Sequence, residues 1–185
     1  MDNLTLITGG VRSGKSLFAE KLAKESRKNI CYIATMPVLP EDAEQQERIQ
    51  KHRVRRPQEW QTIEAPYTLP GAIASLEGDT ELCLVDCLTV YISNIILGDT
   101  PESGPRDPYA LESRVISSAE AVLQQTRART DVQFLVVTNE VGWGVVPDNQ
   151  LARAFRDFVG IANQILASDA KLVYMMCSGI PIKVK

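Results

Sequence analysis

Eight residues near the start of the chain form a pattern that can hold the phosphates of a nucleotide. They satisfy G-x-x-x-x-G-K-[ST] and are Gly9, Gly10, Val11, Arg12, Ser13, Gly14, Lys15 and Ser16. In this pattern glycines let backbone N–H groups converge on phosphate oxygens, the lysine reaches the β- and γ-phosphates, and the hydroxyl can bind Mg²⁺. The apolar run LTLIT precedes it and a helical pattern follows. We therefore interpret it as a P-loop for a nucleoside triphosphate, rather than as a glycine-rich turn without ligand.

Polar side chains also follow two later apolar runs. Asp86 comes directly after LCLV, so we expect its carboxylate at the carboxyl edge of a sheet, where it can bind a metal together with Ser16. A helix cap is the alternative interpretation of an aspartate at this place. Thr138, Asn139 and Glu140 follow a second run and could position a substrate hydroxyl, but ordinary turn chemistry by Asn139 would explain them too.

The single histidine of the chain, His52, lies in a basic segment. Arg48 and Ile49 precede His52 by four and three residues, and Arg56 follows it by four, so all of them share one helix face. Further cations surround this face, namely Lys51, Arg53 and Arg55. An imidazole among arginines tends to stay neutral, and a neutral imidazole can attack the α-phosphate of a nucleotide.

A solvated basic helix face remains the alternative to this catalytic interpretation. The same alternative applies to three charged residues on a later predicted helix, Arg153, Arg156 and Asp157.

These candidate residues require a sheet that brings strand ends together. Apolar, β-rich runs predict strands at Leu4–Thr8, Ile30–Ala34, Leu82–Asp86, Phe134–Thr138 and Leu172–Cys177. Helical periodicity predicts helices at Lys15–Arg27, Glu41–Arg55, Leu88–Leu97, Tyr109–Arg129 and Asn149–Ala167. The predicted fold class is therefore α/β, a P-loop NTPase-like and mostly parallel sheet with helices on both faces. Ile180–Val184 can add an antiparallel edge strand at the C-terminus, and the segment Gly98–Pro108 is expected to be a surface loop.

Length and composition narrow the class of protein. The 185 residues suit one nucleotide-binding domain, residues 1–185, from which the helix at about 41–55 with His52 protrudes. The net charge of −3 gives no overall polycation for nucleic acid, and no apolar run approaches the roughly 20 residues that span a bilayer. The first strand leaves no room for a secretory leader. Four cysteines in or beside apolar runs indicate free thiols in a reducing cytoplasm, and structural zinc is not expected.

Several motifs together resemble a known family. The segment Arg48-Ile49-x-x-His52-Arg53-x-x-Arg56-Pro57-x-x-Trp60 lies between the GGVRSGKS loop and TNEVGWGVVP. Together with RxFRDxxGxxNQ and the terminal SGIPIKVK, it closely resembles the bifunctional adenosylcobinamide kinases and adenosylcobinamide-phosphate guanylyltransferases of cobalamin biosynthesis. The resemblance runs from about Leu4 to the end of the sequence.

The resemblance implies two reactions and a set of residues for them. One reaction phosphorylates adenosylcobinamide with ATP or GTP, and the other transfers GMP from GTP through a guanylylated histidine, giving adenosylcobinamide-GDP and pyrophosphate. It implies catalytic roles for His52 and Lys15, metal binding by Ser16 and Asp86, Mg²⁺ as cofactor and a homotrimer. It implies contacts to nucleotide or metal by the P-loop residues and by Ala34, Thr35, Met36, Arg53, Val54, Arg55, Arg56, Glu64 and Asp86.

Two other functions fit parts of the sequence. A P-loop kinase of another small molecule would use His52 and its arginines only to clamp substrate. A GTP-binding regulatory module would share the P-loop, but the sequence has no N-K-x-D motif for guanine.

Overall fold

A seven-stranded sheet forms the centre of the computed structural model, which describes residues 3–38, 41–98 and 108–185. Its strands are β1 (Leu4–Gly9), β2 (Ile30–Ala34), β3 (Gln61–Glu64), β4 (Leu82–Asp86), β5 (Gln133–Val137), β6 (Leu172–Cys177) and β7 (Ile180–Lys183). They lie in the order β3-β2-β4-β5-β1-β6-β7. All neighbouring strands are parallel except β6 and β7. This confirms the predicted class, including the antiparallel edge strand.

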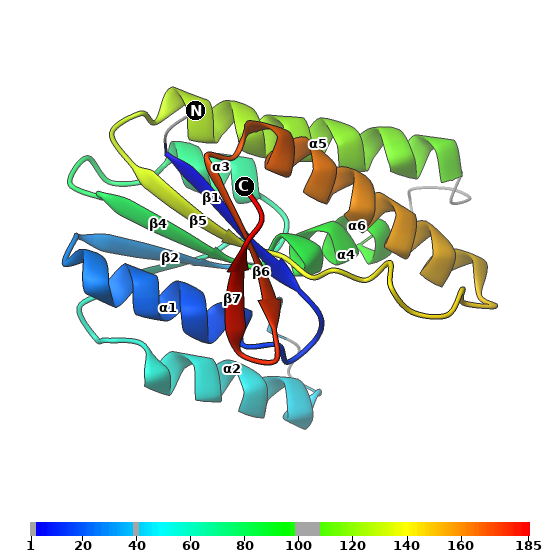
Figure 1. Ribbon diagram of the computed structural model, residues 1–185, viewed down its shortest axis with the longest axis horizontal. Coiled ribbons are helices and arrows are strands. Elements are labelled where there is room, and N and C mark those ends of the chain that lie inside the picture. The colour runs from blue at the N-terminus through cyan, green and yellow to red at the C-terminus, as the bar shows by residue number, and fades with distance from the viewer. Residues whose placement is uncertain (1–2, 39–40, 99–107) are drawn as a thin grey trace.

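Helices cover both faces of the sheet (Figure 1). They are α1 (Lys15–Ser26), α2 (Ala43–Arg55), α3 (Leu69–Ala74), α4 (Leu88–Leu97), α5 (Pro108–Ala128) and α6 (Gln150–Asp169). Helices α3 to α6 pack on one face and α1 on the other, while α2 lies on the outer side of α1. Within the described ranges, no helix combines the length and the apolar character needed to cross a membrane.

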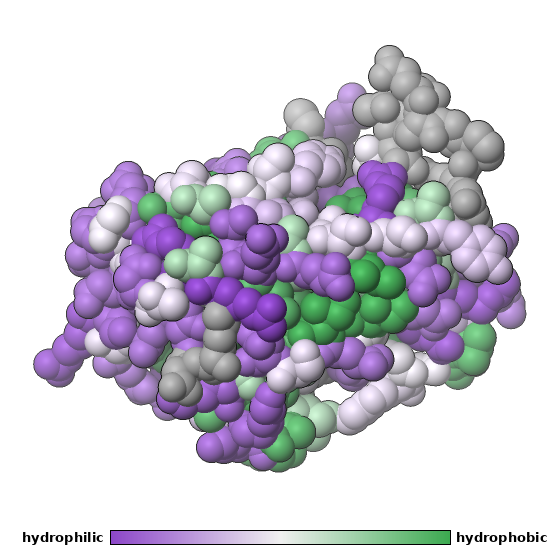
Figure 2. All heavy atoms as spheres, turned by 90° about the horizontal axis from the view of Figure 1, so that it is seen from above, coloured by the Kyte–Doolittle hydropathy of each residue, from purple (hydrophilic) through white to green (hydrophobic). Residues whose placement is uncertain are grey.

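The strands are apolar on both sides because both faces are covered. In β1, Leu6 packs toward α3–α6 and Ile7 packs toward α1. In β4, Val85 packs toward α3–α6 and Leu84 packs toward α1. Alternate side chains of a strand point to opposite faces, so continuous apolar runs are what this architecture needs. Seen from above, over α5, the outer surface is mostly hydrophilic, with one larger hydrophobic patch and several smaller ones (Figure 2).

Most predicted elements are present, with bounds that differ by one or two residues. The strand expected at Phe134–Thr138 runs from Gln133 to Val137, and the helix expected from Glu41 begins at Ala43. The helix expected at Lys15–Arg27 ends at Ser26, because Arg27 turns to a positive φ of 54°. The helices expected at Tyr109–Arg129 and Asn149–Ala167 are Pro108–Ala128 and Gln150–Asp169, and the side chain of Asn149 caps the second. Most of the loop expected at Gly98–Pro108 lies outside the described residues.

Two elements are absent from the prediction, strand β3 and helix α3. Strand β3 extends the sheet beyond β2, and α3 covers the face on which α5 packs. The sequence patterns predict no helix or strand between residues 56 and 81, where the structure has both of these elements.

Candidate functional site

The P-loop lies where the sequence predicts it, between the end of β1 and the start of α1. Two of its glycines adopt positive φ angles, 143° at Gly9 and 95° at Gly14, which favour glycine. Gly14 occupies the N-cap position of α1, so the loop leads directly into a helix N-terminus. A helix N-terminus with converging N–H groups favours a bound anion.

Two other segments of the chain hold the loop from outside. The N–H of Gly179, in the turn between β6 and β7, donates to the Ser13 carbonyl at 2.9 Å. The N–H of Glu140, just after β5, donates to the Gly9 carbonyl at 2.9 Å. The loop is thus fixed by both neighbours of β1.

Lys15 is buried and folds back over the loop. Its Nζ donates to the Gly10 carbonyl and lies 3.4 Å from Ser13 Oγ. Burial lowers the pKa of Lys15 from its ordinary value, while the neighbouring Cys87 and Asp86 oppose that shift. The ammonium group therefore lies inside the curve of the loop, where its charge can stabilise a bound phosphate group.

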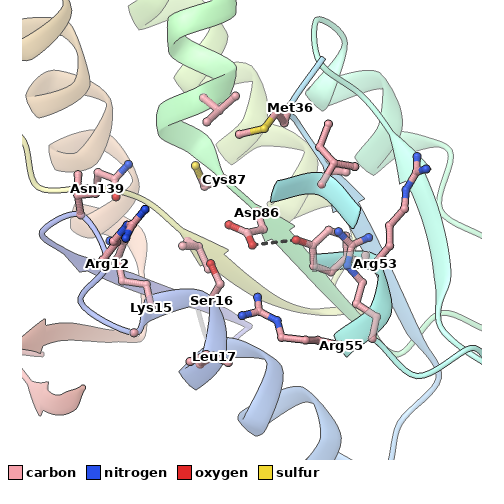
Figure 3. Close-up of a pocket in the computed structure, with 18 of the residues that line it drawn as sticks. Arg12, Lys15, Ser16, Leu17, Met36, Arg53, Arg55, Asp86, Cys87 and Asn139 are labelled. Atoms are coloured by element: carbon pink, nitrogen blue, oxygen red, sulfur yellow. Dashed lines mark hydrogen bonds between the residues drawn. The ribbon is translucent and has the colours of Figure 1, made fainter. Parts of the chain in front are cut away.

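A cavity of about 450 Å³ opens beside the loop (Figure 3). Most of the predicted site residues line it: Val11, Arg12, Ser13, Gly14, Lys15, Ser16, Ala34, Met36, Arg53, Arg55, Arg56, Glu64 and Asp86. Among the predicted residues whose side chains the structure describes, four do not line the cavity: Gly9, Gly10, Thr35 and Val54. Thr35 is fully buried and exchanges hydrogen bonds with the backbone of Cys87, whereas Val54 is exposed.

His52 belongs to α2 by its backbone, but its side chain lies outside the part of the chain that the structure describes. Its neighbours Arg53, Arg55 and Arg56 all reach the cavity wall. The basic segment found in the sequence therefore borders the same cavity as the P-loop.

Ion pairs and a stacking contact hold these arginines in place. Arg53 pairs with Glu64 of β3, and Arg55 pairs with the buried Glu20 of α1 at 3.1 Å. The guanidinium carbon of Arg56 lies 3.4 Å from the centre of the Tyr32 ring. Arg56 Nε is buried without a hydrogen-bond partner among the described residues. Cations from the P-loop and from residues 53–56 thus surround one cavity, which suits a polyphosphate.

Asp86 projects into this cavity from the end of β4 (Figure 3). The Tyr32 hydroxyl donates a hydrogen bond of 2.8 Å to Asp86 Oδ2. Burial, followed by the charge of Asp86, raises the pKa of Tyr32 well above its usual value, so this hydroxyl stays protonated and donates. The residue at the N-cap position of α4 is Cys87 and not Asp86, which does not favour the alternative helix-cap role.

The side chains of Ser16 and Asp86 line the same cavity from two neighbouring elements. A hydroxyl and a carboxylate are hard oxygen donors, which is the donor set that Mg²⁺ prefers. The residues present therefore fit this cation.

Asn139, which also lines the cavity, is held by a buried polar network. Its N–H donates to Thr89 Oγ1 at 2.6 Å, and its carbonyl accepts from Asn163 Nδ2 at 3.0 Å. Thr138 Oγ1 joins the two by contacts of 3.0 Å to Thr89 Oγ1 and 2.6 Å to Asn163 Oδ1. The Glu140 carboxylate instead accepts from the N–H of Gly142 at 3.1 Å, which is turn chemistry.

The later charged residues have contacts away from the cavity. Arg153 donates to the carbonyls of Pro147 and Asp148 at 2.8 and 2.7 Å, and so ties the loop after β5 to α6. Arg156 lies near Asp157, at 3.9 Å.

Sequence reasoning missed several residues that line the cavity, namely Leu17, Tyr32, Val38, Ile49, Cys87, Val90 and Val137. Of these residues, Tyr32 carries a hydroxyl group that donates a hydrogen bond to Asp86, a predicted site residue. Its position inside an apolar strand gives no signal in the sequence.

Known proteins resemble this chain over almost its whole length. A family described as cobinamide kinase / cobinamide phosphate guanyltransferase matches residues 5–184. The bifunctional adenosylcobalamin biosynthesis protein CobU of Salmonella typhimurium is 38% identical over 183 residues, covering 98% of this chain and 99% of that protein. The bifunctional adenosylcobalamin biosynthesis protein CobP of Pseudomonas aeruginosa is 38% identical over 181 residues, or 97% and 96% of the two chains.

Among solved structures, an ATPase from the type III secretion system of pathogenic bacteria has a TM-score of 0.53. It is 12% identical, and the likeness covers 94% of this chain and 50% of that one. At this identity the likeness concerns the fold alone, and it agrees with the predicted nucleoside-triphosphatase architecture.

Proposed function

Because the chain belongs to the cobinamide kinase / cobinamide phosphate guanyltransferase family, we propose that it carries out both reactions on adenosylcobinamide during adenosylcobalamin biosynthesis. The kinase reaction uses ATP or GTP, and the transferase reaction uses GTP. One observation supports this most directly. The P-loop, Asp86 and the basic segment beside His52 border a single cavity, so one nucleotide site can serve both steps.

In the kinase step, the substrate hydroxyl attacks the γ-phosphorus, and the bond from that phosphorus to the oxygen it shares with the β-phosphate breaks. The nucleoside diphosphate leaves, and the hydroxyl proton passes to water. Lys15 and the N–H groups of the P-loop hold the β- and γ-phosphates and stabilise the charge that develops on them. Asn139 lies on the wall of the cavity on the side of Arg12, away from Arg53 and Arg55 (Figure 3). Because hydrogen bonds fix its backbone, we assign Asn139 to positioning the substrate hydroxyl.

In the transfer step, an imidazole nitrogen of His52 attacks the α-phosphorus, and the bond to the leaving pyrophosphate breaks. A phosphate oxygen of adenosylcobinamide phosphate then attacks the same phosphorus, and the phosphorus–nitrogen bond breaks. Arg53, Arg55 and Arg56, which line the cavity, bind the phosphates in this step. The assignment of His52 rests on the family motif and on the position of its helix.

We assign Mg²⁺ to Ser16 and Asp86, where it would neutralise phosphate charge and polarise the reacting phosphoryl group. The proposal also includes one nucleotide-binding domain for both activities, a homotrimer and a cytoplasmic location. Three of the four free cysteines are buried, which suits a reducing compartment.

The test labels GTP at the α-phosphate or at the γ-phosphate and measures acid-labile, alkali-stable label on the protein. We expect label from the α position alone. His52→Asn should lose it and keep phosphorylation of adenosylcobinamide, whereas Lys15→Ala should lower phosphorylation by at least about 100-fold. Gln50→Ala, an exposed position on the same helix, serves as the matched control and should behave as wild type.

Other outcomes would favour the alternatives. Phosphorylation of adenosylcobinamide with no protein label in protein that binds GTP would remove His52 from catalysis and leave a kinase. Hydrolysis of GTP without any transfer to a corrinoid would instead favour a regulatory GTP-binding module.

A further inference from the structure

Tyr32 connects the centre of a buried strand to the rim of the nucleotide cavity. It lies in the middle of β2, directly beside β4, and its side chain is only 2% exposed. From this position its hydroxyl reaches Asp86 Oδ2 at 2.8 Å, across the two neighbouring strands. Figure 3 shows the contact inside the cavity, with the Asp86 carboxylate on the side that faces Ser16.

The ring of Tyr32 has little freedom to move. It packs in the apolar cluster under α1, with Trp60, Leu84 and Cys87. On one face the guanidinium group of Arg56 stacks at 3.4 Å from the ring centre. A donor held in this way fixes the orientation of the carboxylate that accepts from it, because rotation of the carboxylate would break the hydrogen bond.

We propose that Tyr32 is a positioning residue that orients the Asp86 carboxylate for Mg²⁺, and that Arg56 keeps the Tyr32 ring in place from the cavity side. This rests on the metal assignment within the proposed function. Tyr32 touches no reacting atom, so its effect should appear in the coupling between the cation and the nucleotide.

Nucleotide binding in the presence and absence of Mg²⁺ measures this coupling. Titration calorimetry gives the Kd of GTP in EDTA and in excess Mg²⁺. The coupling is the Kd in EDTA divided by the Kd in excess Mg²⁺. For Tyr32→Phe we expect the ratio to fall by about 10-fold to 100-fold, the range typical of losing a partner that orients a metal ligand. The Kd in EDTA should change less than about twofold, because the phosphate contacts of the P-loop remain.

Tyr91→Phe is the matched control. Tyr91 is also a buried tyrosine, 3% exposed, with its hydroxyl bonded to Ser118, but it packs on the other face of the sheet. It should keep the wild-type ratio. In an Asp86→Asn background, Tyr32→Phe should change the ratio no further, because Tyr32 acts through Asp86.

Several results would overturn the proposal. They are an unchanged ratio in Tyr32→Phe, an equal rise of both Kd values, an additive loss in the double variant, or no effect of Mg²⁺ on the wild type. If Tyr32→Phe does not fold, NMR of tyrosine labelled at Cζ in the wild type replaces it. Mg²⁺ added to the GTP complex should shift the Tyr32 resonance, and an unmoved resonance contradicts the assignment.

The measurement uses no corrinoid and therefore separates this inference from the proposed function. A chain with Tyr32-dependent coupling but no GMP transfer would reject the function and keep the positioning role.

Discussion

At Gly9, the space around one backbone carbon decides whether the phosphate loop can close. A Cβ placed there would lie 2.5 Å from the Met176 carbonyl oxygen of β6, and the φ angle of 143° would strain any residue with a side chain. At Gly10, the next position, a Cβ would meet nothing within 4 Å. The two glycines therefore differ in what they require, although the sequence pattern alone does not distinguish them.

Gly9→Ala should weaken GTP binding by at least about tenfold, because strain of about 1–3 kcal/mol at a backbone position is relieved by moving the loop. Gly10→Ala should bind GTP within about twofold of the wild type. Fluorescence titration with a labelled GTP analogue compares the two. Equal affinities for both variants would show that the contact with β6 does not shape the loop.

Some of the site could be predicted from single residues and some could not. Lys15 was predictable because it belongs to a spaced sequence motif, and Asp86 because it stands at the end of an apolar strand. Tyr32 was not, because it looks like any aromatic residue of a buried strand and its partner is 54 positions away. Only the pairing of β2 with β4 brings the two together.

Among the elements, α2 depends on contacts at its C-terminal end. Arg55 pairs with Glu20 of α1 at 3.1 Å, and Lys24 of α1 donates to the Arg55 carbonyl at 3.2 Å. The Glu20 side chain is only 4% exposed. Together with the pair between Arg53 and Glu64, these contacts set the position of the helix that carries His52.

Glu20→Ala should slow formation of the α-labelled protein by about tenfold or more, because small misplacements of a nucleophile are costly in rate. The kinase step should change less than about twofold, since the P-loop contacts are unaffected. Glu25→Ala is the control, because Glu25 lies on the same helix, is exposed, and pairs with Lys21 one turn away. A similar loss in both reactions would mean that Glu20 supports the fold of α1 rather than the position of α2.

The strands that position the site were predictable because helices cover them on both sides and make them continuously apolar. Strand β3 is different: it has four residues at the edge of the sheet, alternately half-buried and exposed. Helix α3 has six residues, including Pro70 and Gly71 near its start. Such short elements carry too few turns or alternations for a periodicity to emerge, and packing against the rest of the molecule stabilises them.

At the scale of the whole molecule, one sheet joins two apolar clusters. Trp60 is buried in the cluster under α1, whereas Trp143 is 76% exposed in the loop after β5. Because the same strands contribute side chains to both clusters, neither should persist without the other.

We expect a single cooperative unfolding transition in urea. In Trp143→Phe, the fluorescence of Trp60 and the far-ultraviolet circular dichroism should give the same midpoint. GTP with Mg²⁺ at 100 times its Kd should raise the free energy of unfolding by about 2.7 kcal/mol, through binding to the native state. Lys15→Ala should show no such increase at the same ligand concentration. Separate midpoints for the two signals would mean that the two faces unfold independently.

The strand order has a consequence for how the protein is synthesised. Ribosomes deliver β1 and the P-loop before β5 and β6, the two strands that lie beside β1 in the sheet. The Met176 carbonyl beside Gly9 arrives with β6, and the Gly179 N–H that donates to Ser13 follows it. A nascent chain released before Leu172 would contain every residue of the nucleotide motif and none of the backbone of β6 that positions it. The P-loop is therefore translated well before the strands and the turn that hold it in place.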